Sequence, residues 1–519
     1  MIRLFLLCPA LFFSVMNAIA QYPNILIGNT NSANEPSIMI NPKNTDQMVA
    51  GSNINNYYYS SDAGTTWTSG QLSSPYGVWG DPVIIVDTTG NFYFLHLSNP
   101  SSGEWIDRIV SQKSTNGGQT WSTGTFMGLN GSKDQDKEWG VVNRMNNHIY
   151  VTWTQFDNYG SFNSLDSSVI LFSKSINSGV SWSPPKRINR VAGDCLDMDN
   201  TVEGAVPAVG PNGEIYVSWA GPLGLVFNSS PDGGNTWNDT NIFVCSIPGG
   251  WDYMVGGIYR ANGLPVTCCD LSNGPSHGNV YINWSDQRNG TTDTDVWFVK
   301  STDGGLSWCA PKRVNDDPPG RQQFFTWMTV DQVTGYIYFV FYDRRNYTDN
   351  RTDVYMAVSR DGGETFENFK ISDSPFNPNA GVFFGDYTCV SAHNNVVRPI
   401  WTRLQYSALS VWTATIDSIN VGTGPDPKPY VSLSLDQNYP NPVKEHTYFS
   451  YKVHSPTKVT LKVFNILGKE IASLFQDKMV NAGKYIEYFD VSGNRFPPGI
   501  YYFSLTTGEQ TLKRKMIID

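Results

Sequence analysis

Short apolar runs alternate with polar turns along most of the chain, and they recur in groups of three. In one group the runs are LPVTCCD (264–270), NVYINWS (279–285) and DVWFVKS (295–301), and KRVND (312–316) follows after a polar turn. The first run is short and apolar, as expected for a strand buried on both faces. The later runs alternate apolar and polar positions, as expected for strands with one face toward a core. The pattern therefore predicts repeated four-stranded antiparallel sheets.

The first run of the group occurs seven times, and its copies begin at Pro36, Pro82, Gly140, Ala205, Leu264, Trp327 and Tyr387. The seventh group, from DYTCVSA (386–392) to LSVWTATI (409–416), lacks a fourth run, and one apolar run, YPNILI (22–27), is left over near the N-terminus. Pairing of this run with the last group would remove exposed sheet edges that promote aggregation. We therefore expect an all-β fold: a seven-bladed β-propeller in residues 21–420 whose N-terminal strand closes the last blade.

A turn with the pattern S-x-D-x-G-x-[ST]-[WF], with Asn for Asp in some copies, follows the third run of six groups. It spans 60–67, 114–121, 175–182, 230–237, 301–308 and 359–366. The Asp or Asn can bond the turn backbone, the Gly supplies positive φ, and the closing ring is a large apolar group to bury between sheets. These turns resemble the Asp boxes (BNR repeats) of the sialidase superfamily and of other Asp-box propellers. The resemblance implies that the boxes are structural and lie far from the active site.

The two ends of the sequence differ from the repeated region. Residues 1–20 combine a basic residue, an apolar run and a small-residue site at Ala18-Ile19-Ala20, as is typical of a secretory signal peptide. Residues 421–430 are rich in Pro and Gly and predict a linker to residues 431–519. No stretch after the leader is apolar enough to predict a transmembrane segment in the mature chain.

Several stretches of residues 431–519 closely resemble the type A C-terminal sorting domain of the type IX secretion system. They include QNYPNP (437–442), VTLKVFNILGKEI (459–471) and KRKMIID (513–519). The resemblance implies a small Ig-like β-sandwich that is read by the outer-membrane machinery. It also implies a secreted or cell-surface protein that passes through the periplasm. The alternative is an ordinary carbohydrate-binding or adhesive sandwich, because a fold alone does not give a function.

Charge and cysteine content narrow the function classes. The chain has 519 residues and a net charge of −10, and no basic stripe is visible, so nucleic acid is not an expected partner. Apart from Cys8 in the leader, six cysteines are present, and six allow fifteen disulfide connectivities. The alternative is that some of them are buried, unpaired side chains.

In a propeller, the loops before each first strand share one face with the loops between second and third strands, and the Asp boxes lie on the other face. The first set of loops supplies carboxylates in five groups: Glu35, Asp81, Glu138, Glu203 and Asp386. The second set supplies Asp157, Asp286, Arg288, Asp343, Arg344, Arg345 and Arg403. Aromatic residues expected at the same mouth are Trp79, Trp139, Tyr342 and Tyr387. Charged groups that bind hydroxyls or a carboxylate, together with rings that stack on a sugar, suit a glycan or glycoprotein.

Two other interpretations of the carboxylates stay open. Carboxylates repeated at one position of each blade can fix neighbouring loops by accepting backbone N–H groups or by pairing with Arg on the next blade. Several of them together could also hold Ca²⁺, which needs six to eight oxygen ligands. No other metal or cofactor is expected.

We therefore expect a secreted, sialidase-like propeller that acts on glycans as a glycoside hydrolase, with paired carboxylates. The candidate catalytic residues are Glu203, Asp81 and Glu138. The candidate substrate-binding residues are Arg288, Arg344, Arg345, Arg403, Asp286, Asp343, Asp386, Tyr387, Trp79 and Trp139. The F/Y-R-I-P arginine motif of sialidases is absent, because no Arg occurs between Arg3 and Arg108. The alternative is a non-catalytic surface propeller that binds glycan or protein at the same mouth, and a structural surface-layer component is a third hypothesis.

Overall fold

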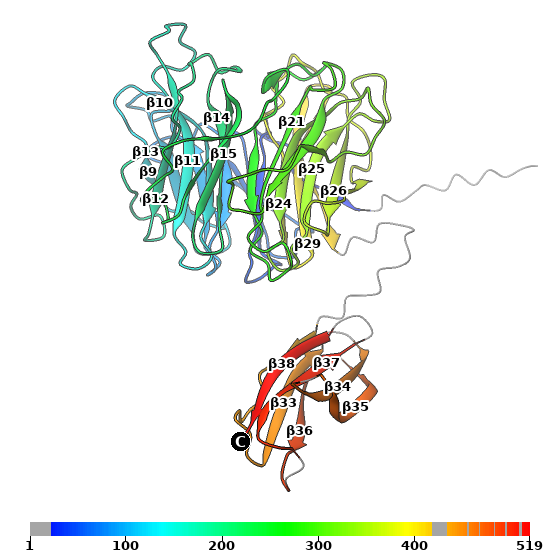
Figure 1. The fold of residues 1–519 in the computed structure, drawn as a ribbon. Helices are drawn as coiled ribbons and strands as arrows, with labels where there is room; N and C mark the ends of the chain where they lie inside the picture. Colours follow the sequence, from blue (N-terminus) through cyan, green and yellow to red (C-terminus); the bar gives the residue numbers. More distant parts are fainter. Residues whose placement is uncertain are drawn as a thin grey trace, which may run out of the picture. The chain divides into compact units, whose positions relative to one another are not determined.

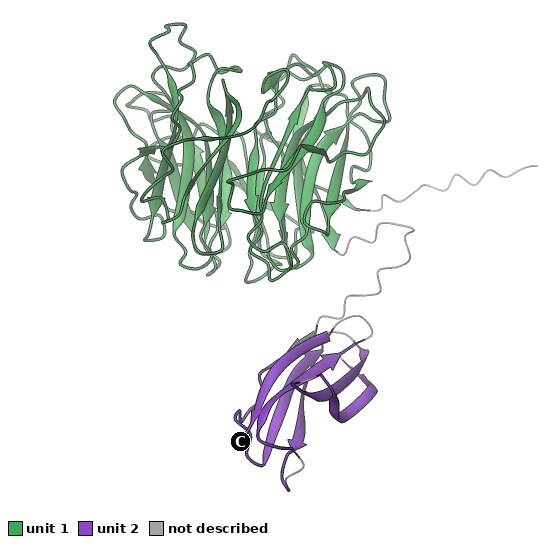
Figure 2. Cartoon of the chain, viewed as in Figure 1, with its two compact units in different colours: residues 1–421 green, residues 422–519 purple. Residues whose placement is uncertain are grey.

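The computed structural model describes residues 22–417 and 433–519, apart from 454–455, 467, 482, 494–495 and 508–510. The predicted leader (1–20) and linker (421–430) lie outside these residues. The chain divides into two compact units, residues 1–421 (unit 1) and 422–519 (unit 2) (Figure 2). The described parts of both units consist of small antiparallel sheets and contain no helix (Figure 1), as the alternating pattern predicts. Accordingly, no helix in these parts is long and apolar enough to cross a membrane.

The described residues of unit 1 form six four-stranded sheets, one five-stranded sheet and one two-stranded hairpin. The first three sheets are β2 (Ser37–Ile40), β3 (Met48–Ser52), β4 (Asn56–Ser60) and β5 (Thr68–Gln71); β6 (Val83–Val86), β7 (Phe92–Leu97), β8 (Ile109–Ser114) and β9 (Thr125–Met127); and β10 (Asp134–Val142), β11 (Ile149–Phe156), β12 (Ser168–Ser175) and β13 (Lys186–Arg187). The next three are β14 (Glu203–Val209), β15 (Ile215–Gly221), β16 (Gly224–Ser230) and β17 (Ile242–Cys245); β20 (Val266–Cys269), β21 (Val280–Asp286), β22 (Asp295–Ser301) and β23 (Lys312–Arg313); and β24 (Gln323–Val330), β25 (Ile337–Asp343), β26 (Asp353–Ser359) and β27 (Glu367–Lys370).

The last sheet combines the two ends of unit 1. It contains β28 (Cys389–His393), β29 (Val396–Gln405), β30 (Ala408–Ala414), β31 (Ile416–Asp417) and β1 (Asn24–Gly28). β1 pairs antiparallel with β30, so that Leu26 lies beside Trp412. This pairing confirms the prediction that the run at 22–27 supplies the missing strand. A short hairpin, β18 (Asp252–Tyr253) and β19 (Ala261–Asn262), is inserted between the fourth and fifth sheets.

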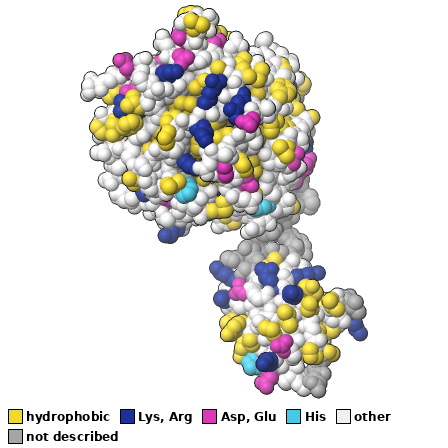
Figure 3. Space-filling view, turned by 60° about the vertical axis from the view of Figure 1, so that its left-hand side comes forward, with side chains coloured by type: hydrophobic (Ala, Val, Ile, Leu, Met, Phe, Trp, Pro, Cys, Tyr) yellow, Lys and Arg dark blue, Asp and Glu magenta, His cyan; other side chains and the backbone are white. Residues whose placement is uncertain are grey.

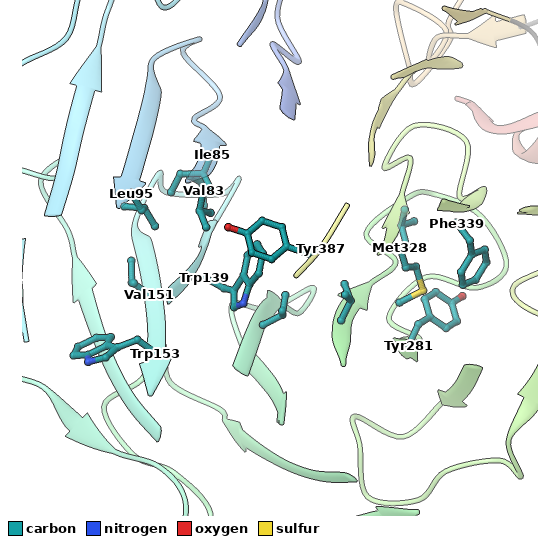
Figure 4. Packing of buried hydrophobic residues seen from close by; sticks show 14 of the residues in the cluster. Val83, Ile85, Leu95, Trp139, Val151, Trp153, Tyr281, Met328, Phe339 and Tyr387 are labelled. Carbon is teal, nitrogen blue, oxygen red and sulfur yellow. The ribbon is translucent and has the colours of Figure 1, made fainter. Parts of the chain in front are cut away.

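The seven sheets form a closed ring around their first strands. β2, β6, β10, β14, β20, β24 and β28 contact one another in this order, and β28 also contacts β2. The second strands add repeated tryptophans to the core, and Trp153, Trp219, Trp284 and Trp401 are at most 1% exposed. At the centre of the ring the side chains of Trp139 and Tyr387 point toward each other (Figure 4).

The Asp-box turns connect the third and fourth strands of the first six sheets, as predicted. In the fifth turn, Ser301 Oγ accepts the N–H of Gly305 at 2.8 Å and donates to Asp303 at 2.7 Å. Gly305 has a φ of +91°, and a Cβ there would lie 2.2 Å from the ring of Phe227 in the preceding sheet. The closing ring of Trp308 also packs on Phe227, with centroids 5.2 Å apart. The turn therefore holds neighbouring sheets together, and this contact leaves no room for a larger residue in place of Gly305.

The six cysteines in the described residues form no disulfide bond. Cys195, Cys269 and Cys389 are buried, and Cys245, Cys268 and Cys309 are half-buried. Of the two sequence interpretations, the structure agrees with unpaired side chains packed within the fold.

Unit 2 consists of two antiparallel sheets around one apolar core. The first contains β32 (Leu433–Leu435), β33 (His446–Val453) and β36 (Gly483–Asp490), and the second β34 (Thr457–Asn465), β35 (Glu470–Val480), β37 (Gly499–Thr506) and β38 (Thr511–Ile518). Phe449 of the first sheet and Phe503 of the second meet in this core, with ring centroids 4.3 Å apart. β33 alternates buried and exposed positions, because only one face of its sheet covers the core.

The N-terminal strand provides a test of ring closure. Ile27 is 6% exposed and packs with Ile38 and Ile400, whereas its neighbour Leu26 is 42% exposed. We expect Ile27→Ala to lower the free energy of unfolding by about 2–5 kcal/mol, because it leaves a cavity. The matched control Leu26→Ala should change it by about 0.5 kcal/mol or less. Urea denaturation of both variants measures the difference, and equal effects would contradict the packing of β1.

Candidate functional site

An unusual backbone conformation recurs at the start of the first strands. Glu35, Asp81 and Lys137 have positive φ values of 49°, 50° and 52°. This left-handed region costs a non-glycine residue about 1–2 kcal/mol. In β10 a bulge follows Asp136, and in β14 a bulge follows Glu203. Such bulges re-aim side chains beside functional sites, and here they bring acidic and basic side chains of different sheets together.

A buried lysine connects several of these side chains. Lys137 is 6% exposed, and its Nζ donates to Asp386 Oδ2 at 2.6 Å and lies 3.8 Å from Asp81 Oδ2. Arg260, beside the inserted hairpin, pairs with the same Asp386, with Nε 2.8 Å from Oδ1. It also contacts Asp197, with Nη1 3.2 Å from Oδ2. The network therefore joins β10, the loops before β6, β14 and β28, and the hairpin.

These cations keep one carboxylate of the site ionised. Burial alone would raise the pKa of Asp386, but the ammonium of Lys137 and the guanidinium of Arg260 outweigh it and hold that pKa well below its ordinary value. Asp386 is 3% exposed. It is therefore a fixed negative charge that is screened little by water.

Two glutamates of the site have no such partner. Glu203 and Glu138 are each 1% exposed, and among the described residues no hydrogen-bond partner reaches their carboxyl oxygens. Burial and then the nearby Asp197 raise the pKa of Glu203 well above its usual range. Burial and then Asp81 do the same to the pKa of Glu138. Both side chains therefore favour the neutral, protonated form.

Glu35 has a different role, because its oxygens are used within the protein. Oε1 accepts the N–H of Asp386 at 3.0 Å, and Oε2 accepts the side-chain amide of Asn53. Asn53 in turn accepts the N–H of Asp81 at 3.0 Å. Glu35 therefore fixes the loops of the first, second and last sheets, which is the structural role that the sequence left open for this group of carboxylates.

Two adjoining pockets open at this network. One, with a cavity volume of only about 20 Å³, is lined by Glu203, Asp386, Lys137, Arg260 and Asp197 among others. The other, with a cavity volume of about 20 Å³, shares Lys137 and Asp386 with it and is also lined by Trp139, Trp327 and Tyr387. The ring centroid of Trp139 lies 4.4 Å from the centroid of Trp327 and 5.0 Å from the centroid of Tyr387. Trp139 and Tyr387 are only 6% and 8% exposed. These two candidates therefore form the floor of the pocket and offer little free ring surface on which a sugar could stack.

An aromatic ledge, made of Trp79, Trp105 and Tyr159, leads from the pocket along the surface. The hydroxyl of Tyr159 donates to Asp197 at 2.5 Å, which ties the ledge to the pocket. Trp105 lies between the other two rings, with centroids 5.7 Å from Tyr159 and 6.1 Å from Trp79. Trp79 and Trp105 are each 40% exposed. Of these three, the sequence pattern indicated Trp79 alone.

The candidate arginines are held by partners of their own or neighbouring loops. Arg288 pairs with Asp286 at 2.6 Å, and its guanidinium lies 4.2 Å from the ring centroid of Trp297. Arg345 pairs with Asp343 at 2.8 Å and with Asp316 at 2.6 Å. On the face of unit 1 shown in Figure 3, Lys and Arg side chains likewise lie next to Asp and Glu side chains.

The other candidates between second and third strands are also engaged. Arg403 pairs with Asp373 at 3.2 Å, and Asp157 with Lys133. Arg344 is 5% exposed and donates to Thr352 Oγ1 at 3.0 Å. Tyr342 is fully buried and donates to the carbonyl of Thr402 at 3.0 Å. None of these residues lines either pocket at the network.

The carboxylates of the site surround cations of the protein itself. Lys137 and Arg260 lie between Asp81, Asp197 and Asp386 and partly neutralise them. In the part of the chain that the structure describes, no group of three or more His, Cys, Asp or Glu side chains is arranged to hold a metal ion. The Ca²⁺ hypothesis therefore finds no ligand set there.

Sequence reasoning missed the residues that organise the site. Lys137 directly precedes Glu138, but the bulge gives Lys137, not Glu138, the backbone conformation of Glu35 and Asp81. In β14 the corresponding residue is Gly204, directly after Glu203. Arg260 lies in an insertion between two repeats, and only the extra length before the fifth group signals it.

Comparison with known proteins identifies the C-terminal unit. Residues 437–519 match the family model of the secretion system C-terminal sorting domain. The match confirms the resemblance found in the sequence. It indicates a secreted or cell-surface protein that the type IX secretion machinery recognises. No curated protein sequence matches the chain.

Solved structures resemble the chain at low sequence identity. The NanB sialidase of Streptococcus pneumoniae is 9% identical, with 72% of this chain and 83% of that chain covered and a TM-score of 0.44. An ulvan lyase of polysaccharide lyase family 25 is 13% identical, with 75% and 95% covered and a TM-score of 0.44. A fungal alcohol oxidase of the AA5 family is 9% identical, with 96% and 99% covered and a TM-score of 0.50. Sialidases are thus among the structural neighbours, and at such identities the likeness concerns the fold alone.

The raised pKa of Glu203 predicts a pH-dependent effect on stability. A carboxyl whose pKa is higher in the folded than in the unfolded chain retains its proton on folding. Its contribution to the free energy of unfolding is therefore fully present below the unfolded pKa of about 4.3, and it is lost as the pH rises above that value. Glu203→Gln removes this loss. We expect the variant and wild type to have the same melting temperature near pH 4. At pH 7 the melting temperature of the variant should be at least about 2 °C higher.

Glu214→Gln is a control of opposite sign. Burial would raise the pKa of Glu214, but hydrogen bonds from Asn212 and from the backbone outweigh it and lower that pKa. Its contribution is therefore present above the unfolded pKa and is lost as the pH falls. Glu214→Gln should melt below wild type at pH 7. If Glu203→Gln also melted below wild type there, the account of Glu203 would be wrong.

Proposed function

We propose that this protein is a secreted glycoside hydrolase whose active site is the pocket beside Glu203 and Asp386. In this proposal the seven sheets are the blades of a seven-bladed propeller, and unit 2 is an Ig-like sandwich that serves export. One observation carries the proposal: a buried carboxyl without a hydrogen-bond partner lines the same pocket as a carboxylate held ionised by two cations. Environments that push two carboxyl pKa values apart are typical of an acid and a charge-stabilising partner.

Glu203 is suited to act as the general acid. A general acid needs a proton at neutral pH and access to the leaving-group oxygen. The raised pKa of Glu203 supports the first requirement and its place in the pocket wall supports the second. An enclosed polar group without a partner costs about 1–3 kcal/mol. Glu35 shows that a buried carboxyl group can find partners for its oxygens here, so the unpartnered state of Glu203 favours a catalytic role.

Asp386 is suited to stabilise the transition state. Cleavage of a glycosidic bond develops positive charge at the anomeric carbon, and a fixed carboxylate lowers the energy of that charge. In the proposed reaction, the glycosidic C–O bond breaks and Glu203 gives its proton to the departing oxygen. Water then adds to the anomeric carbon, and the proton that it loses returns to Glu203. The other two catalytic candidates, Asp81 and Glu138, do not line the pocket with Glu203. We assign Asp81 to positioning Lys137, which it contacts, and give Glu138 no step in the reaction.

The charges of the site favour an uncharged glycan. Lys137 and Arg260, the Lys and Arg residues lining the pocket, are both ion-paired. A sialic acid carboxylate would need unpaired guanidinium groups, and a further carboxylate would be repelled by Asp386. The aromatic ledge offers exposed rings on which neutral sugar faces can stack. We therefore propose a neutral oligosaccharide with further sugar units on Trp105 and Trp79.

Non-catalytic glycan binding at the same pocket is the second candidate function. The low exposure of Glu203 and Asp386, 1% and 3%, favours it, because a reacting bond must reach both groups. The ledge would serve binding equally well. Turnover distinguishes the two candidates.

A panel of fluorogenic glycosides, with neutral hexosides and a sialoside, tests the catalytic proposal. We expect release of the fluorophore from a neutral member, and we expect Glu203→Gln to lower kcat by about 10²- to 10⁴-fold, because the acid is lost. Asp386→Asn should also lower kcat, whereas Glu214→Gln should not. Turnover that survives Glu203→Gln unchanged would contradict the site. Saturable binding on a glycan array without any turnover would establish the second candidate.

The ledge predicts an effect that depends on substrate length. Trp105→Ala should raise KM for a neutral oligosaccharide by about 2- to 10-fold, as expected for loss of a ring contact of about 0.5–1.5 kcal/mol. It should leave KM for a monosaccharide glycoside unchanged. Phe162, 91% exposed and outside the ledge, provides the control Phe162→Ala. Equal changes in KM for the short and the long substrate would argue against a role of the ledge.

A further inference from the structure

A second cavity occupies the opposite end of the ring. Its cavity volume is about 180 Å³, it is partly open to solvent, and every first strand contributes to its wall, from Ile40 of β2 to His393 of β28. The pockets at the network are lined by residues near the beginnings of these strands, whereas this cavity is lined by residues toward their ends. Trp327 lines both sides, and its contact with Trp139 separates the two environments.

Most of the cavity wall is apolar. It is formed in large part by Val86, Val142, Val209, Met328, Val330 and Ala392. Several polar groups of the wall have partners within the protein: Ser391 accepts the N–H of Ile40 at 3.1 Å, and Thr267 bonds Ser218 at 2.6 Å. Such a wall suits an apolar group of a ligand better than a sugar.

Two basic side chains at the end of this cavity have free bonding capacity. Arg144 is exposed, lines both this cavity and an adjoining pocket of about 240 Å³, and makes no hydrogen bond or ion pair with any residue that the structure describes. The nearby carboxylate of Asp331 acts on it electrostatically but already accepts the N–H groups of Asn394 and Asn395, at 3.0 and 2.8 Å. The Nδ1 atom of His393 is enclosed and has no partner among the described residues.

Arg144 and His393 are close enough to influence each other. Burial and then the guanidinium of Arg144 lower the pKa of His393, and together they outweigh Asp331 and the backbone of Pro42, which raise it. The imidazole is therefore neutral at pH 7, and Arg144 is the permanent cation at this end of the cavity. An unpaired guanidinium at the open end of an apolar cavity is an arrangement that an anionic head group would complete.

We propose that this end of the ring binds a small amphiphile with a carboxylate head and an unbranched apolar tail. The head pairs with Arg144 at the open end, and the tail lies against the valine and methionine side chains of the cavity. The head stays near solvent while the tail is removed from water, which is the favourable direction for both parts. This site is separate from the proposed active site and does not depend on it.

Isothermal titration calorimetry with decanoate at pH 7, with decanol as the uncharged match, tests the proposal on the leaderless chain. We expect one saturable site for decanoate, weaker binding of decanol, and at least tenfold weaker decanoate binding in Arg144→Gln. Arg360→Gln is the matched control, because Arg360 lies in an Asp box and pairs with Glu367 outside the cavity. Absence of saturable decanoate binding, or equal binding by Arg144→Gln and wild type, would overturn the proposal.

A second variant tests the cavity independently of the charge. Ala392→Leu adds three carbons to the cavity wall and leaves Arg144 in place. It should weaken decanoate binding while its melting curve stays cooperative, and a shorter carboxylate such as butyrate should be affected less. Full decanoate affinity in a folded Ala392→Leu protein would place the ligand elsewhere and contradict the assignment.

Discussion

The contact between the Lys137 ammonium and the Asp386 carboxylate determines much of the chemistry of this protein. Burial would lower the pKa of Lys137, but Asp386 and then Asp81 outweigh it and hold that pKa well above its usual range. Losing one partner of a buried pair costs about 3–5 kcal/mol, because it leaves an uncompensated charge. The two cations of the network, Lys137 and Arg260, both pair with Asp386. Glu203 and Glu138 are left to retain protons.

The ring brings these groups together and keeps other functions apart. First strands from seven sheets meet at one axis, so Lys137 and Asp386, separated by 249 positions, become neighbours. The Asp boxes are at the other ends of the sheets, where Gly305 and Trp308 lock one sheet to the next. The rings of Trp139 and Trp327 divide the centre into a polar mouth and an apolar cavity. The two ends of the ring therefore differ in chemical character.

The repeat determined what could be predicted from sequence. Hydrophobic periodicity and the box turns indicated the sheets, and the unmatched run at 22–27 indicated the strand that pairs with β30. The repeat does not predict which side chains meet across the ring, because these contacts depend on bulges and insertions that interrupt it. Lys137 occupies a bulge, and Arg260 lies beside an inserted hairpin. The sequence predicts that Arg288 and Arg345 bind substrate. In the structure they pair with Asp286 and Asp343 of the same turns. Hydrophobic periodicity does not encode such side-chain contacts.

The protonation state of Glu203 at neutral pH is the most direct measure of the central claim that the mouth has too little positive charge to ionise all its carboxyls. Infrared difference spectra between wild type and Glu203→Gln, recorded across the pH range, isolate the signal of this one side chain. The account predicts the carbonyl band of a protonated carboxyl at pH 7. A carboxylate band at that pH would contradict it, because an ionised Glu203 could neither act as a general acid nor remain enclosed without a partner.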